Sequence, residues 1–224
     1  MPPKPKFSKE EIVAAAFDII KKDGISALTA RDLGAYLGTS SRPIFTYFQT
    51  MEELKLAARE LALKEFLEYI SDYRDYTPAF KRIGMMIVSY GIHQPELFKL
   101  LFMQEHKENR GFENTIADLG EIGDVCIELI EQDYTLTADQ ARLVFEQMWT
   151  HAYGLGVMCA MCVCDLSEEE IGKRLGTMFA GLIMLIQSGR VDQVYSDIEK
   201  GCDGTYHGMK LSDLPYLPNN RESR

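Results

Sequence analysis

Residues 28–48 read LTARDLGAYLGTSSRPIFTYF, and this stretch decides the fold. Thr29 and Asp32 have the spacing of a helix N-terminal cap, in which a side chain accepts a hydrogen bond from a backbone amide three positions later. A short helix is therefore expected from residue 29 to residue 37, and Gly38 is expected to end it.

A second short helix is expected over residues 40–48. Ser40 or Ser41 can cap it, and Pro43 is tolerated only within a first turn. One face of this helix is expected to point inward, and its apolar side chains are Ile44, Phe45 and Phe48.

The two helices and their turn have the properties that a helix-turn-helix requires. Gly34 is small enough to let the second helix cross close to the first, and Gly38 supplies backbone angles that other residues resist. The second helix of such a motif enters the major groove, where polar side chains bond phosphates or base edges. The residues expected to contact DNA are Thr29, Arg31, Ser40, Ser41, Arg42, Pro43, Thr46, Tyr47 and Lys55. An ordinary helical hairpin with a polar surface would show the same spacing.

Charge is distributed unevenly along the chain. Residues 1–50 contain seven basic and five acidic side chains, a net charge of +2, whereas residues 51–224 contain 17 basic and 29 acidic ones, a net charge of −12. Only the N-terminal end therefore suits a polyanion such as DNA.

The composition indicates a folded protein that stays in the cytoplasm. Of the 224 residues, 46% are hydrophobic, enough to bury a core, and five cysteines are too few and odd in number for a disulfide scaffold. No apolar run follows the N-terminal lysines, so no signal peptide is expected. The longest apolar stretches, 152–164 and 175–186, fall short of the roughly 18 residues that span a bilayer.

The rest of the chain is also expected to be helical, which makes the protein all-α. The N-terminal domain contains one further helix, and glycines, prolines and caps divide the remainder; these helices are expected at 9–24, 50–73, 79–93, 95–108, 112–133, 138–164 and 168–188. The expected organisation is a DNA-binding domain (1–50), a connecting helix (51–74), a ligand-binding and dimerisation domain (75–189) and a partly disordered tail (190–224).

Residues 9–58 resemble the N-terminal domain of the TetR/AcrR transcriptional regulators. The resemblance rests on residues 28–40, on Ile44-Phe45-Thr46-Tyr47-Phe48 and on Glu52-Glu53-Leu54. It implies a homodimeric, usually repressive regulator that binds a palindromic DNA operator and releases it when a small apolar or amphipathic ligand binds the C-terminal domain.

The chain departs from the usual pattern of that family at several positions. Arg42 and Pro43 replace glycine and threonine, Phe45 replaces a tyrosine that contacts phosphate, and Met51 replaces a lysine. Two contacts to the DNA backbone that the resemblance would imply therefore do not carry over to these positions. Nearby lysines are candidates to replace them, namely Lys4, Lys6, Lys9 and Lys55.

Aromatic and sulfur-containing side chains in the C-terminal half suit an adaptable pocket for an apolar ligand. The candidate ligand-binding residues are Phe98, Phe102, Met103, Met148, Trp149, His151 and Tyr153. For any one of them packing in an ordinary core is the favoured interpretation, and a pocket among these helices is what the resemblance implies.

Small residues recur every four positions in the last two helices, where they permit close helix contacts. The resemblance implies that these helices form a four-helix dimer interface, for which the candidate residues are Gly156, Ala160, Gly172, Gly176, Ala180 and Ile183. Packing within one chain is the alternative interpretation.

Cys159, Cys162 and Cys164 suggest an alternative function. If Cys159 and Cys162 share a helix face, two thiolates could bind a soft metal ion or form a redox switch in a helical sensor that does not bind DNA. No basic residue lies beside them to favour a thiolate, so buried, inert cysteines are expected and no metal or cofactor is expected.

Enzymatic activity is not expected. The sequence has no glycine-rich phosphate loop and no His-Glu-x-x-His motif, and it lacks the Glu-x-x-His pairs of di-iron helical bundles.

Overall fold

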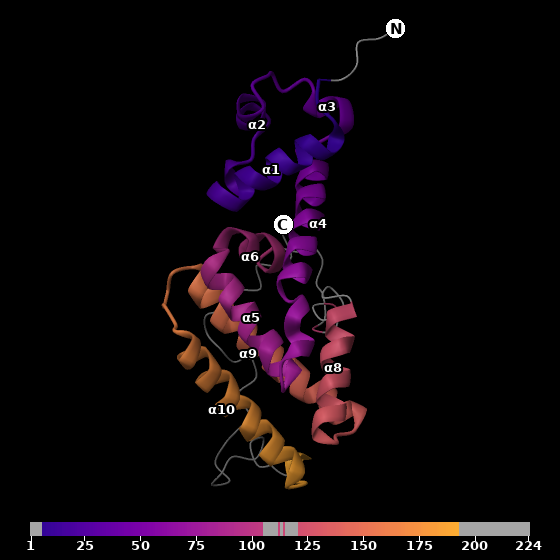
Figure 1. Ribbon diagram of the computed structural model, residues 1–224, viewed down its shortest axis with the longest axis vertical. Coiled ribbons are helices and arrows are strands. Elements are labelled where there is room, and N and C mark those ends of the chain that lie inside the picture. The colour runs from indigo at the N-terminus through magenta and orange to yellow at the C-terminus, as the bar shows by residue number, and fades with distance from the viewer. Residues whose placement is uncertain (1–5, 105–111, 113, 115–120, 193–224) are drawn as a thin grey trace, which may run out of the picture. The chain divides into compact units, whose positions relative to one another are not determined.

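The computed structural model describes residues 6–104, 112, 114 and 121–192. The described residues form helices and turns without β-strands, which confirms the all-α expectation (Figure 1). The chain forms two compact units, residues 1–179 and 180–224, and each is described by itself. The domain boundaries expected from the sequence stay a prediction, and most of the expected tail lies outside the described residues.

Most of the described helices begin and end close to where the sequence places them, while part of the helix expected over 112–133 lies outside the described residues. The described helices are α1 (Lys9–Asp23), α2 (Ala30–Tyr36), α3 (Ile44–Tyr47), α4 (Met51–Tyr69), α5 (Ala79–His93), α6 (Pro95–Phe102), α8 (Glu121–Tyr134), α9 (Ala138–Ala160) and α10 (Glu168–Gln187), with short 3-10 turns at Ile25–Ala27 and Ser71–Asp75. The helix expected over 95–108 ends at Phe102, and the one expected over 138–164 ends at Ala160.

Side-chain caps fix the starts of these helices. The hydroxyl of Ser8 accepts a hydrogen bond from the amide of Glu11, and the Glu11 carboxylate accepts one from the amide of Ser8. Thr29 and Thr50 accept the same kind of bond at α2 and α4. Each cap satisfies an amide that has no partner inside the helix, so a local sequence pattern determines where the helix begins.

Helix α4 links the two parts of the first unit. Figure 1 shows α1, α2 and α3 near the N-terminal end of α4, α6 beside its middle, and α5, α8 and α9 nearer its other end. Helix α1 packs against both α4 and α6, so the N-terminal helices touch the C-terminal ones directly as well as through α4.

Helices α5 and α9 form the centre of the C-terminal helices and pack closely. A methyl group built on Gly91 of α5 would lie 2.7 Å from the carbonyl oxygen of Gly156 in α9. A methyl group on Gly156 would lie 2.6 Å from the ring of Phe98, which is fully buried. Both positions therefore require glycine for the helices to come this close.

Candidate DNA-binding surface and ligand cavity

The crossing of α2 and α3 has the geometry of a helix-turn-helix. A methyl group on Gly34 would lie 3.0 Å from the carbonyl carbon of Ser40 and 3.1 Å from the amide nitrogen of Ser41. The chain that enters α3 therefore passes over α2 at a distance that only a glycine permits without a shift. The role expected for Gly34 fits this packing.

The turn between the two helices is a Schellman motif. Gly38 has a φ of 63°, its amide donates to the carbonyl of Ala35, and the amide of Thr39 donates to the carbonyl of Gly34. These bonds satisfy carbonyl groups that the end of α2 leaves free. Because Gly38 has the left-handed conformation that favours glycine, the turn depends on this residue.

The second helix of the motif is shorter than the sequence predicts. Helix α3 begins at Ile44, while residues 40–43 form a turn that leads into it. The expected inward position of Phe45 is wrong, since its side chain is 48% exposed. Ile44 and Phe48 lie one turn apart and are buried, whereas Phe45 lies about 100° away around the helix and faces outward.

The residues expected to contact DNA differ in their exposure and in their partners. Thr29, Arg31, Ser40, Arg42 and Thr46 are exposed, whereas Ser41, Pro43, Tyr47 and Lys55 are half-buried.

Two of the half-buried residues already have partners in the protein. The Tyr47 hydroxyl donates to the carbonyl of Phe7 over 3.0 Å, and the ammonium of Lys55 lies 2.7 Å from the carboxylate of Glu52. Both side chains are therefore held in place before DNA arrives, and a contact of either with phosphate stays a prediction.

The N-terminal segment places positive charge beside the motif. The ammonium of Lys6 donates to the carbonyl of Gly38 over 3.4 Å, and the ammonium of Lys9 lies 5.4 Å from the centre of the Phe48 ring. Tyr47 holds this segment through Phe7. Lys4, the other candidate replacement, lies outside the described residues.

Two polar contacts and one close packing contact connect α1, α4 and α6. The ammonium of Lys21 in α1 lies 2.7 Å from the carboxylate of Glu65 in α4. The Arg59 guanidinium in α4 donates to the carbonyl of Leu101, close to the end of α6, over 3.1 Å. The carboxylate of Glu96 lies so close to Gly24 that a methyl group there would be 2.6 Å from it. A movement of α6 would therefore change its contacts with both α1 and α4.

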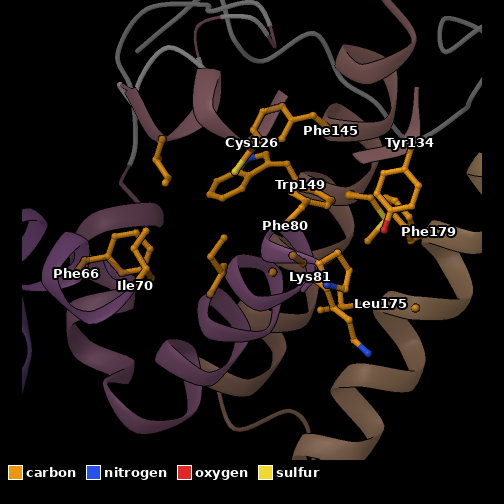
Figure 2. A pocket seen from close by; sticks show the side chains of 17 residues that line it. Phe66, Ile70, Phe80, Lys81, Cys126, Tyr134, Phe145, Trp149, Leu175 and Phe179 are labelled. Carbon is orange, nitrogen blue, oxygen red and sulfur yellow. The ribbon is translucent and has the colours of Figure 1, made fainter. Parts of the chain in front are cut away.

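A cavity lies among α4, α5, α8, α9 and α10 in the first unit. It has a volume of about 130 Å³, and Figure 2 shows the aromatic rings that gather around it. Its lining residues are Phe66, Ile70, Pro78, Phe80, Lys81, Gly84, Ile87, Ile122, Cys126, Tyr134, Phe145, Met148, Trp149, Ala152, Leu175, Gly176 and Phe179.

Two of the seven candidate ligand-binding residues, Met148 and Trp149, line this cavity. Phe102 lies behind it, with its ring centre 5.3 Å from that of Phe66 and 6.0 Å from that of Trp149. Phe98 is fully buried beside Phe102, at 5.0 Å between ring centres.

The other three candidates lie away from the cavity lining. Tyr153 donates its hydroxyl to the carbonyl of Phe102 over 2.7 Å, and Met103 follows the last residue of α6. His151 has a buried Nε2 without a hydrogen-bond partner among the described residues. The role of these three in ligand binding stays a prediction.

Most of the lining residues were not expected from the sequence. The expectation rested on the aromatic and sulfur-containing side chains of residues 98–103 and 148–153, and not on which residues share a helix face. Phe80, Gly84 and Ile87 occur at i, i+4 and i+7 of α5, so they share one face. Leu175 and Phe179 do the same in α10, and all five line the cavity. This periodicity was a usable signal, although it does not say which faces meet.

The six candidate dimer residues do not form one exposed surface. Gly156 and Ala160 are buried within the chain, so packing inside one subunit accounts for them and their assignment to the seam is corrected. Gly176 lines the cavity, and Ile183 is buried.

The two remaining candidates differ from each other. A methyl group on Gly172 would contact Met85 within the same chain at 3.7 Å, so this glycine also faces its own subunit. Ala180 is exposed.

The cysteines are arranged differently from the expectation. Helix α9 ends at Ala160, and Cys162, with a φ of 55°, lies in the turn that follows, so Cys159 and Cys162 do not share a helix face. Cys159 is buried, whereas Cys162 is exposed and Cys164 half-buried, so the expectation of buried thiols holds only for the first. Burial, followed by the proximity of Cys164, raises the pKa of Cys159 to about 11.

In the part of the chain that the structure describes, no group of three or more histidine, cysteine or carboxylate side chains has an arrangement that could hold a metal ion. In the same residues, no helix combines the length and apolar character needed to cross a membrane.

A glycine-dependent helix crossing, a Schellman turn and an outward polar face are the features of a helix-turn-helix, the motif of one class of DNA-binding proteins. Residues 12–58 match the model of the family described as bacterial regulatory proteins, tetR family. This match confirms the resemblance seen in the sequence and supports a DNA-binding transcriptional regulator of the TetR family. No curated protein sequence matches the chain.

Proposed function

We propose that the protein is a ligand-responsive repressor that binds a palindromic operator as a dimer and releases it when a small apolar or amphipathic ligand enters the cavity. The observation that carries the proposal is the joint presence of a helix-turn-helix and an aromatic cavity that share α4. A protein of this kind acts in the cytoplasm, where the DNA is. We propose no catalytic activity, since regulators of this family generally act by binding DNA.

The outward side of the motif supports specific recognition of DNA. Arg42 is exposed immediately before α3, and its planar guanidinium can bond the O6 and N7 atoms of one guanine together. Lys6 and Lys9 bring positive charge to the same motif, which suits the phosphates on either side of the contacted bases.

Ligand entry is coupled to DNA through α4 and α6. Phe66 and Ile70 of α4 line the cavity, and Arg59 of the same helix donates to the carbonyl of Leu101 in α6. A ligand that displaces either helix changes the support of α1, because Lys21 bonds Glu65 and Gly24 lies against Glu96. The ligand then favours a conformation in which the two motifs of the dimer no longer fit the two half-sites of the operator at the same time.

A dimer brings two motifs to one operator, and the outer face of α10 is suited to form it. Thr177, Gly181 and Met184 occur at i, i+4 and i+7, and all three are exposed; Met184 is 70% exposed. An exposed stripe with a small residue in its centre and a large apolar side chain at its end favours close contact between identical helices.

The DNA-binding part is tested by fluorescence anisotropy with a labelled duplex from the region upstream of the protein's own gene. The duplex should bind tightly, and log Kd should rise linearly with the logarithm of the salt concentration. A random duplex of the same length is the control. Equal affinity for the two duplexes at every salt concentration would contradict specific operator binding.

The dimer is tested by light scattering on Met184→Glu, with Leu67→Glu as the control because Leu67 is an exposed apolar residue of α4. Met184→Glu should give monomers that bind the operator weakly, and Leu67→Glu should stay dimeric. An intact dimer in Met184→Glu would move the interface away from this stripe.

A further inference from the structure

We propose that the cavity binds a small aromatic carboxylate, with its single ring between the aromatic side chains and its carboxylate at Lys81 and Tyr134. This inference deepens the proposed function and rests on it only for the use of the cavity as a ligand site. It names the ligand by its chemistry: one ring, one negative charge.

The size of the cavity suits a single ring. An apolar cavity of about 150 Å³ in another protein takes up benzene, so the roughly 130 Å³ available here is enough for one six-membered ring. The rings around it favour an aromatic guest, since aromatic pairs gain energy in tilted or edge-to-face contacts at the distances seen between Tyr134 and Phe179 and between Phe80 and Phe179, 4.7 and 6.0 Å.

The polar groups of the lining are hydrogen-bond donors at neutral pH. Lys81 is the one charged side chain among the lining residues, and it forms no ion pair with the described residues. Tyr134 carries a hydroxyl without a hydrogen-bond partner among those same residues. Its pKa is raised by burial and then by the charge of Asp133, so the hydroxyl keeps its proton and can donate.

The lining residues carry no negative charge to attract a cation. They include no aspartate or glutamate, and burial raises the pKa of the Cys126 thiol to about 12, so this group is neutral near pH 7. Aromatic rings alone attract cations, but Lys81 opposes them. A carboxylate is the group that accepts from both Lys81 and Tyr134 and meets no repulsion.

The position of Lys81 suits the charged end of the ligand. Lys81 is exposed, so its ammonium stays hydrated until a ligand arrives, and Figure 2 shows its side chain at the Leu175 end of the cavity, with the ammonium pointing away from the labelled aromatic rings. A ligand whose ring is buried among Phe80, Phe145 and Trp149 would point its carboxylate toward the edge of the cavity near Lys81. The ligand thus gains a charged hydrogen bond without burying an ion completely.

Trp149 reports on the cavity directly, because it lines the cavity and is the single tryptophan of the chain. The full chain is titrated with benzoate, benzamide and benzylamine at neutral pH and constant ionic strength, and tryptophan fluorescence is followed. These three compounds share the ring and differ in the charge of its substituent. Benzoate should bind about tenfold more tightly than benzamide, which corresponds to about 1.4 kcal/mol, and benzylamine should bind most weakly.

Substitutions of Lys81 and Tyr134 test whether these residues cause the preference for benzoate over benzamide. Lys81→Met should bring the Kd of benzoate to within about twofold of that of benzamide, while Lys81→Arg should retain most of the preference. Tyr134→Phe should weaken benzoate several-fold and leave benzamide nearly unchanged. Lys173→Met is the matched control, because Lys173 is an exposed lysine of α10 outside the lining, and it should retain the full preference.

The outcomes separate this proposal from the proposed function. Equal Kd values for benzoate and benzamide, or a preference for benzylamine, would overturn the carboxylate assignment and leave a ring-binding cavity. No saturable change with any of the three compounds would overturn both this proposal and the ligand part of the proposed function. Benzoate that binds in the cavity without weakening the operator complex would support this proposal and refute the release mechanism.

Discussion

The contact between Gly91 of α5 and Gly156 of α9 sets the distance between two central helices, and Gly91→Ala tests it. A methyl group on Gly91 would lie 2.7 Å from the carbonyl oxygen of Gly156 and 3.2 Å from its Cα and carbonyl carbon, whereas ordinary contacts begin at about 3.4 Å. Because the opposing atoms belong to a helix backbone, no side-chain rotation relieves the overlap. The two helices have to separate by several tenths of an ångström.

The expected cost follows from two opposing effects. Overpacking a core costs typically about 1–3 kcal/mol, and a clash with backbone belongs at the upper end of that range. Alanine in place of a helical glycine returns about 1 kcal/mol, because it loses less backbone freedom on folding. The free energy of unfolding should therefore fall by about 2 kcal/mol, which is about 4–8 °C in Tm for a chain of this length.

Gly84→Ala provides the control within the same helix, two turns earlier. A methyl group there would meet Leu175 at 3.5 Å, an ordinary contact, so this variant should be as stable as the wild type or up to about 1 kcal/mol more stable. Thermal unfolding is followed by circular dichroism at one protein concentration, since the Tm of a protein that associates depends on concentration. A Tm for Gly91→Ala at or above that of the wild type would refute the steric reasoning.

Three further variants and one chemical probe test other parts of the structure. Arg42→Ala should cost about 1–3 kcal/mol of binding free energy on the operator and much less on random DNA, measured by anisotropy; equal losses on both would remove Arg42 from base recognition. Tyr47→Phe removes the bond that holds Phe7, so it should weaken operator and random DNA alike, and a reduction in the slope of log Kd against log salt by about 0.9 would indicate that a lysine of the N-terminal segment has lost one phosphate. Thr135→Gly should raise the free energy of unfolding by about 1 kcal/mol, because a threonine with a φ of 52° is strained; an unchanged Tm would argue against that strain. Cys126 and Cys159 have pKa values raised to about 12 and about 11, so near pH 8 they carry little thiolate, and iodoacetamide followed by mass spectrometry should modify them far more slowly than the exposed Cys162. Rapid labelling of Cys159 would contradict its burial.

The sequence by itself determined the features that depend on residues close together in the chain. The cap at Thr50 bonds an amide three residues later, and the Schellman turn at Gly38 closes within six residues. Such interactions compete only with water and with the neighbouring backbone, so the residue types decide them. The helix-turn-helix was readable for this reason, and so was the need for a small side chain at Gly34.

The tertiary structure decided which helix faces meet, and here several sequence interpretations changed. Phe45 was expected in the core because of its apolar side chain, yet α3 is one turn long and buries only Ile44 and Phe48. Phe98 and Phe102 were expected at a ligand, yet they lie behind the cavity and pack against Phe66 and Trp149 instead.

Small residues show most clearly that a sequence pattern does not identify which surfaces meet. A repeat of glycine and alanine predicts that something approaches a helix closely, and it does so equally for a neighbouring helix of the same chain and for a second subunit. For Gly156 the neighbours are Gly91 and Phe98 of its own chain, whereas the space around Gly181 is open. The local pattern fixes the close approach, but the approaching surface belongs to residues far away in the sequence, and only the packed chain brings them together.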